Sequence, residues 1–121
     1  MQWKFSGNKP VYVQIMEHIR GAVLVGNYPP GSQVPPVREW AAEAKVNPNT
    51  MQRALSELER EGLLESHGTI GRFVTEDPAV LEKIREVAID ATIRASAREY
   101  RALGLTMEQA AAMLLALDRE E

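Results

Sequence analysis

Residues 36–61 read PVREWAAEAKVNPNTMQRALSELERE, and the pattern of these residues predicts two helices. Apolar side chains recur at helical spacing on both sides of a short break. The spacing predicts one helix over residues 36–44 and another over residues 48–61, with Asn47 as the N-cap and Pro48 in the first turn. Because the connection is so short, the two helices must cross at a steep angle, which is typical of a helix-turn-helix.

The sequence on either side of this stretch predicts one more helix and a β-hairpin. Residues 10–25 carry apolar side chains at helical spacing and predict a further helix upstream. Downstream, two short strand-like runs, residues 63–67 and 72–75, flank a glycine-containing loop and predict a β-hairpin. A hairpin directly after a helix-turn-helix is a wing, so the sequence predicts a winged helix-turn-helix over residues 1–76.

A shift in composition marks the second part of the chain. All seven prolines lie at or before position 78, and the sequence beyond is rich in alanine. We expect one helix over residues 78–103 and a second after it, opened by a capping box between Thr106 and Gln109. The predicted fold class is therefore mainly α with a small β-wing, in which residues 77–121 form a two-helix tail.

Composition excludes several classes of function. The chain has 121 residues, no cysteine and two histidines, which excludes disulfides and thiolate metal sites and leaves little for zinc. HExxH, GxxxxGK[ST], GxGxxG and GxSxG motifs are absent from the sequence, so we expect no catalytic residues, cofactor or metal. No apolar run has the length of a membrane helix, and the N-terminus has no apolar stretch of signal-peptide length, so we expect neither a membrane partner nor secretion.

The predicted helix over residues 48–61 is the third along the chain, and its polar face favours double-stranded DNA as the partner. This holds although the formal net charge is −3 and both parts of the chain are mildly acidic. Between its apolar positions this helix exposes Asn49, Thr50, Gln52 and Arg53, whose donors and acceptors suit base edges in a major groove. Its N-terminus also offers N–H groups to a phosphate. The alternative is an ordinary polar helix face.

Arg38 and the wing supply further candidate contacts. Arg38 begins the second helix, where it can reach a phosphate or a guanine edge; the alternative is a surface ion pair with a neighbouring glutamate. His67 and Gly68 stand at the wing tip, which can enter a minor groove, and Arg72 can pair with a phosphate. The alternative for the wing is a plain hairpin turn. Trp40 is expected in the core.

The tail carries more apolar surface than two helices can bury between them. Self-association into a symmetric homodimer is the simplest solution, and docking on the front domain of the same chain is the alternative. The residues that we assign to dimerisation are Leu81, Ile84, Ala88, Ala91, Leu114 and Leu117.

Several motifs together resemble one family. They are PVYVQI at residues 10–15, Pro30-Gly31, PVRE at residues 36–39, VNPNTM at residues 46–51, Arg53-Ala54-Leu55, Leu58, Glu61-Gly62-Leu63 and GRFV at residues 71–74. This stretch resembles the GntR-type winged-helix repressors, and the short two-helix tail looks like the YtrA-type subfamily.

The resemblance implies a bacterial, cytoplasmic, homodimeric transcription regulator, usually a repressor, that acts on operons for membrane transporters and often on its own gene. It also implies operator contacts. These fall on Arg38, Asn47, Asn49, Thr50, Gln52, Arg53, His67 and Gly68.

Three positions depart from the family pattern. Pro36 replaces the serine that usually caps the second helix, which puts one phosphate contact in doubt. Trp40 stands where leucine is usual. His67 stands where arginine is common in the wing, and a neutral histidine attracts a phosphate less than arginine does.

Two other classes of function remain open. The polar third helix could bind a protein partner instead of DNA, in a winged-helix interaction module. A cavity between tail and front domain could hold an effector, whose existence and identity the sequence does not give.

Overall fold

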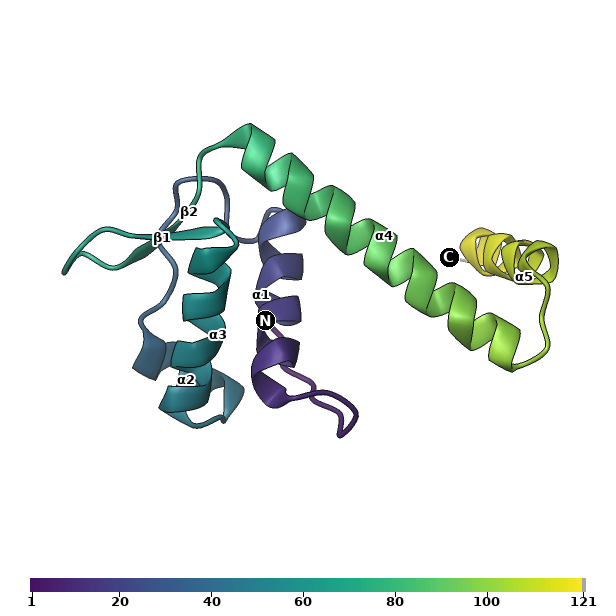
Figure 1. Ribbon diagram of the computed structural model, residues 1–121, viewed down its shortest axis with the longest axis horizontal. Helices are drawn as coiled ribbons and strands as arrows, with labels where there is room; N and C mark the ends of the chain where they lie inside the picture. Colours follow the sequence, from purple (N-terminus) through teal and green to yellow (C-terminus); the bar gives the residue numbers. More distant parts are fainter. Residues whose placement is uncertain (121) are drawn as a thin grey trace. The chain divides into compact units, whose positions relative to one another are not determined.

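The computed structural model describes residues 1–120, and this part of the chain forms five α-helices and two β-strands (Figure 1). In chain order they are α1 (Val11–Leu24), α2 (Val37–Ala44), α3 (Pro48–Arg60), β1 (Leu64–Ser66), β2 (Arg72–Val74), α4 (Pro78–Ala102) and α5 (Met107–Glu120). The predicted fold class, mainly α with a small β-wing, is confirmed, and α1 to α4 begin and end within one residue of the predicted bounds.

The chain divides into two compact units. The first extends from Met1 to Ile84 and the second begins at Arg85, so α4 runs through the boundary. The first turns of α4 belong to the first unit because Leu81 and Ile84 pack on its core. Asp77 caps this helix through a 2.9 Å bond from the Ala79 N–H.

The helix-turn-helix consists of α2, α3 and the turn between them. α3 begins at Pro48 because the side-chain carbonyl of Asn47 accepts the Asn49 N–H at 2.7 Å. α2 ends at Lys45, which has a left-handed backbone with φ 58°. This conformation costs a non-glycine residue roughly 1–2 kcal/mol. The packing of the two helices therefore holds the turn in a shape that its own residue disfavours.

One apolar core joins the three front helices to the wing. Its fully buried side chains from the helices are Ile15, Ile19, Trp40, Met51, Leu55 and Leu58, and Leu63, Leu64 and Val74 close it from the hairpin. The expectation that Trp40 lies in the core is confirmed: its ring meets the ring of Tyr28 edge-on at 5.5 Å. Burial raises the pKa of Tyr28, and the carboxylates of Glu43 and Glu39 raise it further.

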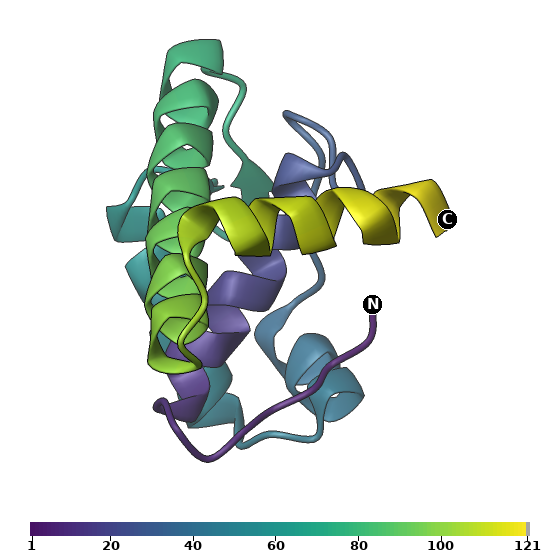
Figure 2. The ribbon, with the colours of Figure 1, turned by 90° about the vertical axis from the view of Figure 1, so that its right-hand side faces the viewer.

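The N-terminal segment folds back along α1 (Figure 2). Ser6 and Gln14 exchange two hydrogen bonds of 2.8 Å, and Trp3 donates its indole N–H to Glu43 on α2 at 2.7 Å. Trp3 also packs on Trp40, with ring centroids 6.1 Å apart. This segment therefore ties α2 to α1, which the pattern of the sequence did not predict.

The wing is an antiparallel hairpin in which Leu64 pairs with Val74 and Ser66 with Arg72. Gln33, in the loop before α2, adds an isolated antiparallel bridge to Phe73. The Val34 N–H donates to the Arg72 carbonyl at 3.0 Å. The wing is thus fastened to the segment that leads into the helix-turn-helix.

The second unit consists of the remainder of α4 and of α5. The predicted capping box of α5 is confirmed, since the Gln109 N–H binds the Thr106 hydroxyl at 3.1 Å and the Gln109 side chain accepts the Thr106 N–H at 2.9 Å. Within residues 1–120 no helix is both long enough and apolar enough to cross a membrane.

Candidate nucleic-acid interface

The polar face of α3 is presented by a helix whose opposite face is locked in the core. Met51, Leu55 and Leu58 are fully buried, whereas Asn49, Gln52 and Arg53 are exposed and Thr50 is half-buried. Gln52 donates its side-chain amide to Ser56 at 3.0 Å, one turn further on. Because the helix cannot rotate without losing its core contacts, these four side chains keep a fixed order along one face.

Arg53 is held in place by an aromatic ring. Its guanidinium carbon lies 3.8 Å from the centroid of the Tyr12 ring on α1. This stacking fixes the guanidinium plane and leaves its outer N–H donors available to a ligand. Tyr12 itself is half-buried against the core. Its support of Arg53 was missed from the sequence, although an aromatic residue on the first helix is the signal that would have suggested it.

Fewer backbone N–H groups are free at the N-terminus of α3 than the sequence suggested. Pro48 has no N–H, and the Asn49 N–H is already bound by the side chain of Asn47. The expected phosphate site made of several free backbone amides is therefore reduced. Asn47 is exposed, and its side-chain carbonyl already accepts the capping hydrogen bond from the Asn49 N–H.

Replacing Asn47 by alanine should lower the free energy of unfolding by about 1 kcal/mol, because the α3 cap is lost. Asn49→Ala is the matched control: Asn49 is exposed and its side chain makes no cap, so a change within about 0.5 kcal/mol is expected. Urea unfolding followed by circular dichroism measures both. Equal destabilisation by the two substitutions would show that the cap contributes nothing.

The N-terminal end of α2 presents Arg38. This side chain is exposed in the first turn, and within residues 1–120 it forms no ion pair with Glu39, Glu43 or any other carboxylate. The N-cap is Pro36, whose side chain makes no cap hydrogen bond. The N–H groups of the first turn of α2 are thus left to an external acceptor.

The basic side chains of the wing lie against carboxylates and an aromatic ring. Arg72 is half-buried and forms an ion pair with Glu59 on α3. His67 stacks on Phe73 with ring centroids 4.6 Å apart, and its Nε2 lies 3.5 Å from Glu65. Arg72 therefore attaches the wing to α3. Gly68 is exposed at the turn, where its φ of 60° suits glycine.

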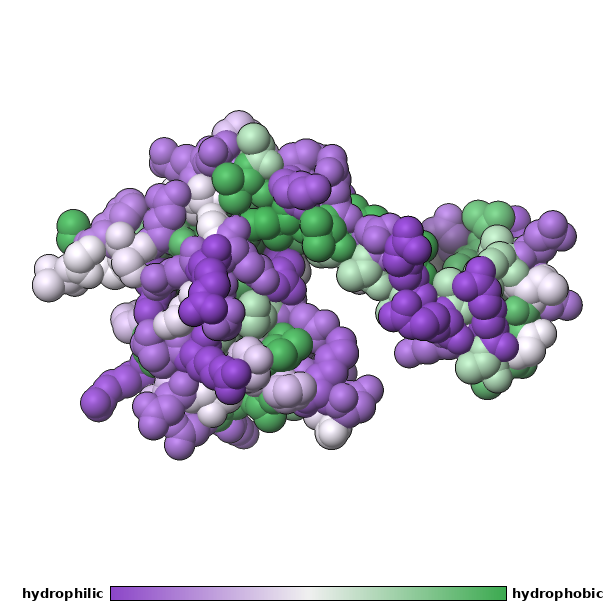
Figure 3. Space-filling model, in the orientation of Figure 1, coloured by the Kyte–Doolittle hydropathy of each residue, from purple (hydrophilic) through white to green (hydrophobic). Residues whose placement is uncertain are grey.

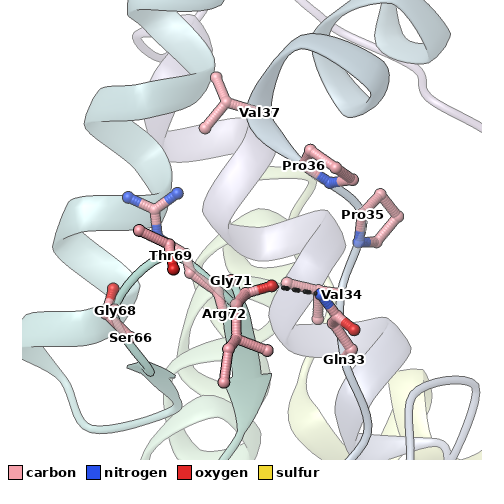
Figure 4. A pocket seen from close by; sticks show the side chains of 11 residues that line it. Gln33, Val34, Pro35, Pro36, Val37, Ser66, Gly68, Thr69, Gly71 and Arg72 are labelled. Carbon is pink, nitrogen blue, oxygen red and sulfur yellow. Dashed lines mark hydrogen bonds between the residues drawn. The ribbon is translucent and has the colours of Figure 1, made fainter.

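A groove separates the wing from the N-terminal end of α2. It has a volume of about 340 Å³, with Pro36 and Val37 on one side and Gly68 and Thr69 on the other (Figure 4), and Ile70 also lines it. The hydrogen bond from the Val34 N–H to the Arg72 carbonyl joins two of its lining residues (Figure 4). The groove brings together two of the three elements, α2 and the wing, that carry the expected DNA contacts.

The residues expected at a dimer interface lie in two places: two of them pack on the core of the first unit, and the others lie on the second unit. Leu81 and Ile84 are half-buried against the core of the first unit. Ala88 is half-buried and Ala91 exposed on α4, while Leu114 and Leu117 on α5 are 48% and 54% exposed. Figure 3 shows hydrophobic surface on the second unit, where exposed residues also include Val87, Ile93, Met113 and Leu115.

Two ion pairs join distant parts of the chain and were not predicted from the sequence. Glu59 on α3 holds Arg72, and Glu61 after α3 holds Arg20 on α1 through two bonds of 2.7 and 2.9 Å. Arg20 and Arg72 are therefore each paired within the protein. Among residues 1–120 no three or more histidines and carboxylates are grouped to hold a metal ion.

The comparison with protein families matches residues 11–74 to the model described as bacterial regulatory proteins, gntR family. The chain is 34% identical to the uncharacterised HTH-type transcriptional regulator YhcF of Bacillus subtilis, over 90% of both chains. It is also 34% identical to the HTH-type transcriptional repressor YtrA of the same bacterium, over 68% of this chain and 71% of YtrA.

Solved structures show the same fold. A GntR family transcriptional regulator from Listeria monocytogenes is 30% identical and superposes with a TM-score of 0.82, over 93% of this chain and 98% of the other. The DNA-binding domain of AraR, in complex with operator ORX1, is 28% identical. It superposes with a TM-score of 0.58 over 62% of this chain and 96% of the AraR domain.

Proposed function

The chain belongs to the GntR family of bacterial regulatory proteins and is a DNA-binding transcription regulator; we propose that it is a repressor that binds an inverted-repeat operator as a homodimer. It regulates a transporter-type operon and its own gene, and it acts in the bacterial cytoplasm. The repressor role is supported by the likeness to YtrA, a transcriptional repressor, and by the short two-helix tail.

One observation carries the proposal. The polar face of α3 is fixed by its buried side, and the groove beside the wing opens at the N-terminal end of α2. A helix held in this way can lie in a major groove while the elements on either side meet the backbone. The proposed DNA contacts are Arg38, Asn47, Asn49, Thr50, Gln52, Arg53, His67, Gly68 and Arg72.

Within this set, we assign different roles to the two free guanidinium groups. Arg53, stacked on Tyr12, is oriented for bidentate donation to a guanine edge in the major groove. Arg38, without an internal carboxylate, meets a phosphate or a guanine edge near the start of α2. Neutral amides of Asn49 and Gln52 read the remaining base edges.

The proposed homodimer rests on the two-helix tail. Exposed leucines on α5 and exposed apolar residues on α4 lie on a protein whose front unit already has its own core. Exposed apolar residues in this number are characteristic of an interface, and a two-fold interface is the commonest way to cover them. Ala88, Ala91, Leu114 and Leu117 are the residues that we assign to it, with Leu81 and Ile84 at its inner end.

The operator DNA of AraR favours a nucleic acid over a protein as the ligand of α3. Selection of genomic fragments by the purified protein at physiological salt, followed by sequencing, tests the proposal. One enriched inverted repeat is expected, upstream of a transporter operon and of the gene for this chain. No enrichment by folded protein, together with tight retention of another protein, would contradict it.

A further inference from the structure

The outer end of the wing carries an exposed apolar side chain. Ile70 is 68% exposed, and Figure 3 shows hydrophobic surface at the outer end of the hairpin, at the left of the view. Its neighbours in the loop are Gly68, Thr69 and Gly71. Covering this side chain with a ligand would remove apolar surface from water, which is favourable.

The backbone of Ile70 is held at both ends. Its N–H donates to the His67 carbonyl at 3.1 Å, and its carbonyl accepts the side-chain amide of Gln33 at 2.8 Å. Gln33 can come this close because residue 71 is glycine: a Cβ there would lie 2.7 Å from the Gln33 amide nitrogen. The hydrogen bond from Gln33 thus fixes the tip of the wing to the loop before α2.

The two basic side chains of the wing have partners within the protein. Arg72 is paired with Glu59, and His67 lies on Phe73 beside Glu65. Ile70 lines the groove whose other side is Pro36 and Val37 at the start of α2. Beside these side chains, the tip of the wing offers DNA its backbone, the exposed Thr69 hydroxyl and the apolar side chain of Ile70.

We infer that Ile70 is an apolar specificity residue that packs into the minor groove beside the site of α3, with Gln33 as its positioning residue. Apolar side chains in a minor groove press on base steps and partly unstack them, and pyrimidine–purine steps yield most easily. The wing therefore selects for a deformable step such as TA or CA at the flank of each half-site. This inference rests on the proposed function.

The test uses the full chain and the selected operator, with each flanking step changed in turn from TA to GG. The wild-type protein is expected to lose affinity at one step in each half-site. Ile70→Ala should bind the TA operator about five- to tenfold more weakly, because apolar contact is lost. It should no longer discriminate between TA and GG. Its salt dependence should match that of the wild type, since no phosphate contact is removed.

Two further variants keep the test specific. Val25→Ala removes an apolar side chain that is 74% exposed in the loop after α1, and it should leave the affinity unchanged. Gln33→Ala should weaken binding in the wild-type background but not in the Ile70→Ala background, because the two residues act through one contact. Additive losses would overturn the positioning role.

The outcomes separate this inference from the proposed function. If the wild-type protein binds an operator and Ile70→Ala stays within twofold of it on every duplex, the inference is overturned and the proposed function stands. Equal loss on TA and GG operators also overturns it, because contact without step selection is not the role assigned. Failure of the wild-type protein to bind any operator contradicts the proposed function itself.

Discussion

Arg38→Ala is expected to weaken operator binding by about 1–3 kcal/mol, or about 5- to 150-fold in Kd. The side chain is exposed in the first turn of α2 and has no ion pair within the described residues, so the free protein should lose little by its removal. Fluorescence anisotropy on the selected operator and on a random duplex, at two salt concentrations, measures the effect.

The random duplex decides what Arg38 contacts. A loss confined to the operator assigns it to a base edge, whereas an equal loss on both duplexes, with a salt slope lower by about one, assigns it to a phosphate. Arg38→Lys is the control that keeps the charge and removes the planar fork. Binding unchanged within twofold in Arg38→Ala, with the fold intact, would contradict a DNA contact at this position.

Leu114→Glu combined with Leu117→Glu is expected to convert the protein to a monomer. Both leucines are about half exposed on α5, and two carboxylates on each copy would be buried facing one another in the proposed interface. Because two linked half-sites reinforce each other, operator affinity should fall by about 100-fold or more. Sedimentation velocity reports the oligomeric state, and anisotropy reports the affinity.

The matched control is the pair Leu114→Met and Leu117→Met, which keeps apolar surface and similar volume and should stay dimeric. Positions 114 and 117 separate the dimer from the fold better than Ile84 does, because Ile84 also packs on the core of the first unit. If the double glutamate variant is folded and remains dimeric, the interface lies elsewhere.

Much of the fold could be predicted because its signals are local. Helical periodicity, Pro48 after Asn47, Gly62 after α3 and the Thr106–Gln109 spacing are each read within one or two turns of chain. The three-residue connection between α2 and α3 then leaves few crossing geometries. These features depend on neighbours in sequence, so one sequence is enough to find them.

The contacts that position the interface were harder to predict because they join distant residues. Gln33 reaches Ile70, Glu59 reaches Arg72, and Arg53 stacks on Tyr12, each across an element boundary. Nothing in the spacing of these pairs distinguishes them from ordinary surface residues. The sequence therefore indicated which helix carries the proposed DNA contacts, but not which side chains hold the wing and the arginines in place.

We propose that α3 lies in the major groove of two symmetric half-sites. Methylation interference on the selected operator tests it directly, because dimethyl sulfate modifies guanine N7 in the major groove and adenine N3 in the minor groove. We predict that N7 methylation blocks binding at two symmetric clusters about one helical turn apart, and that N3 methylation interferes beside them. Interference without two-fold symmetry, or at N3 alone, would contradict the account.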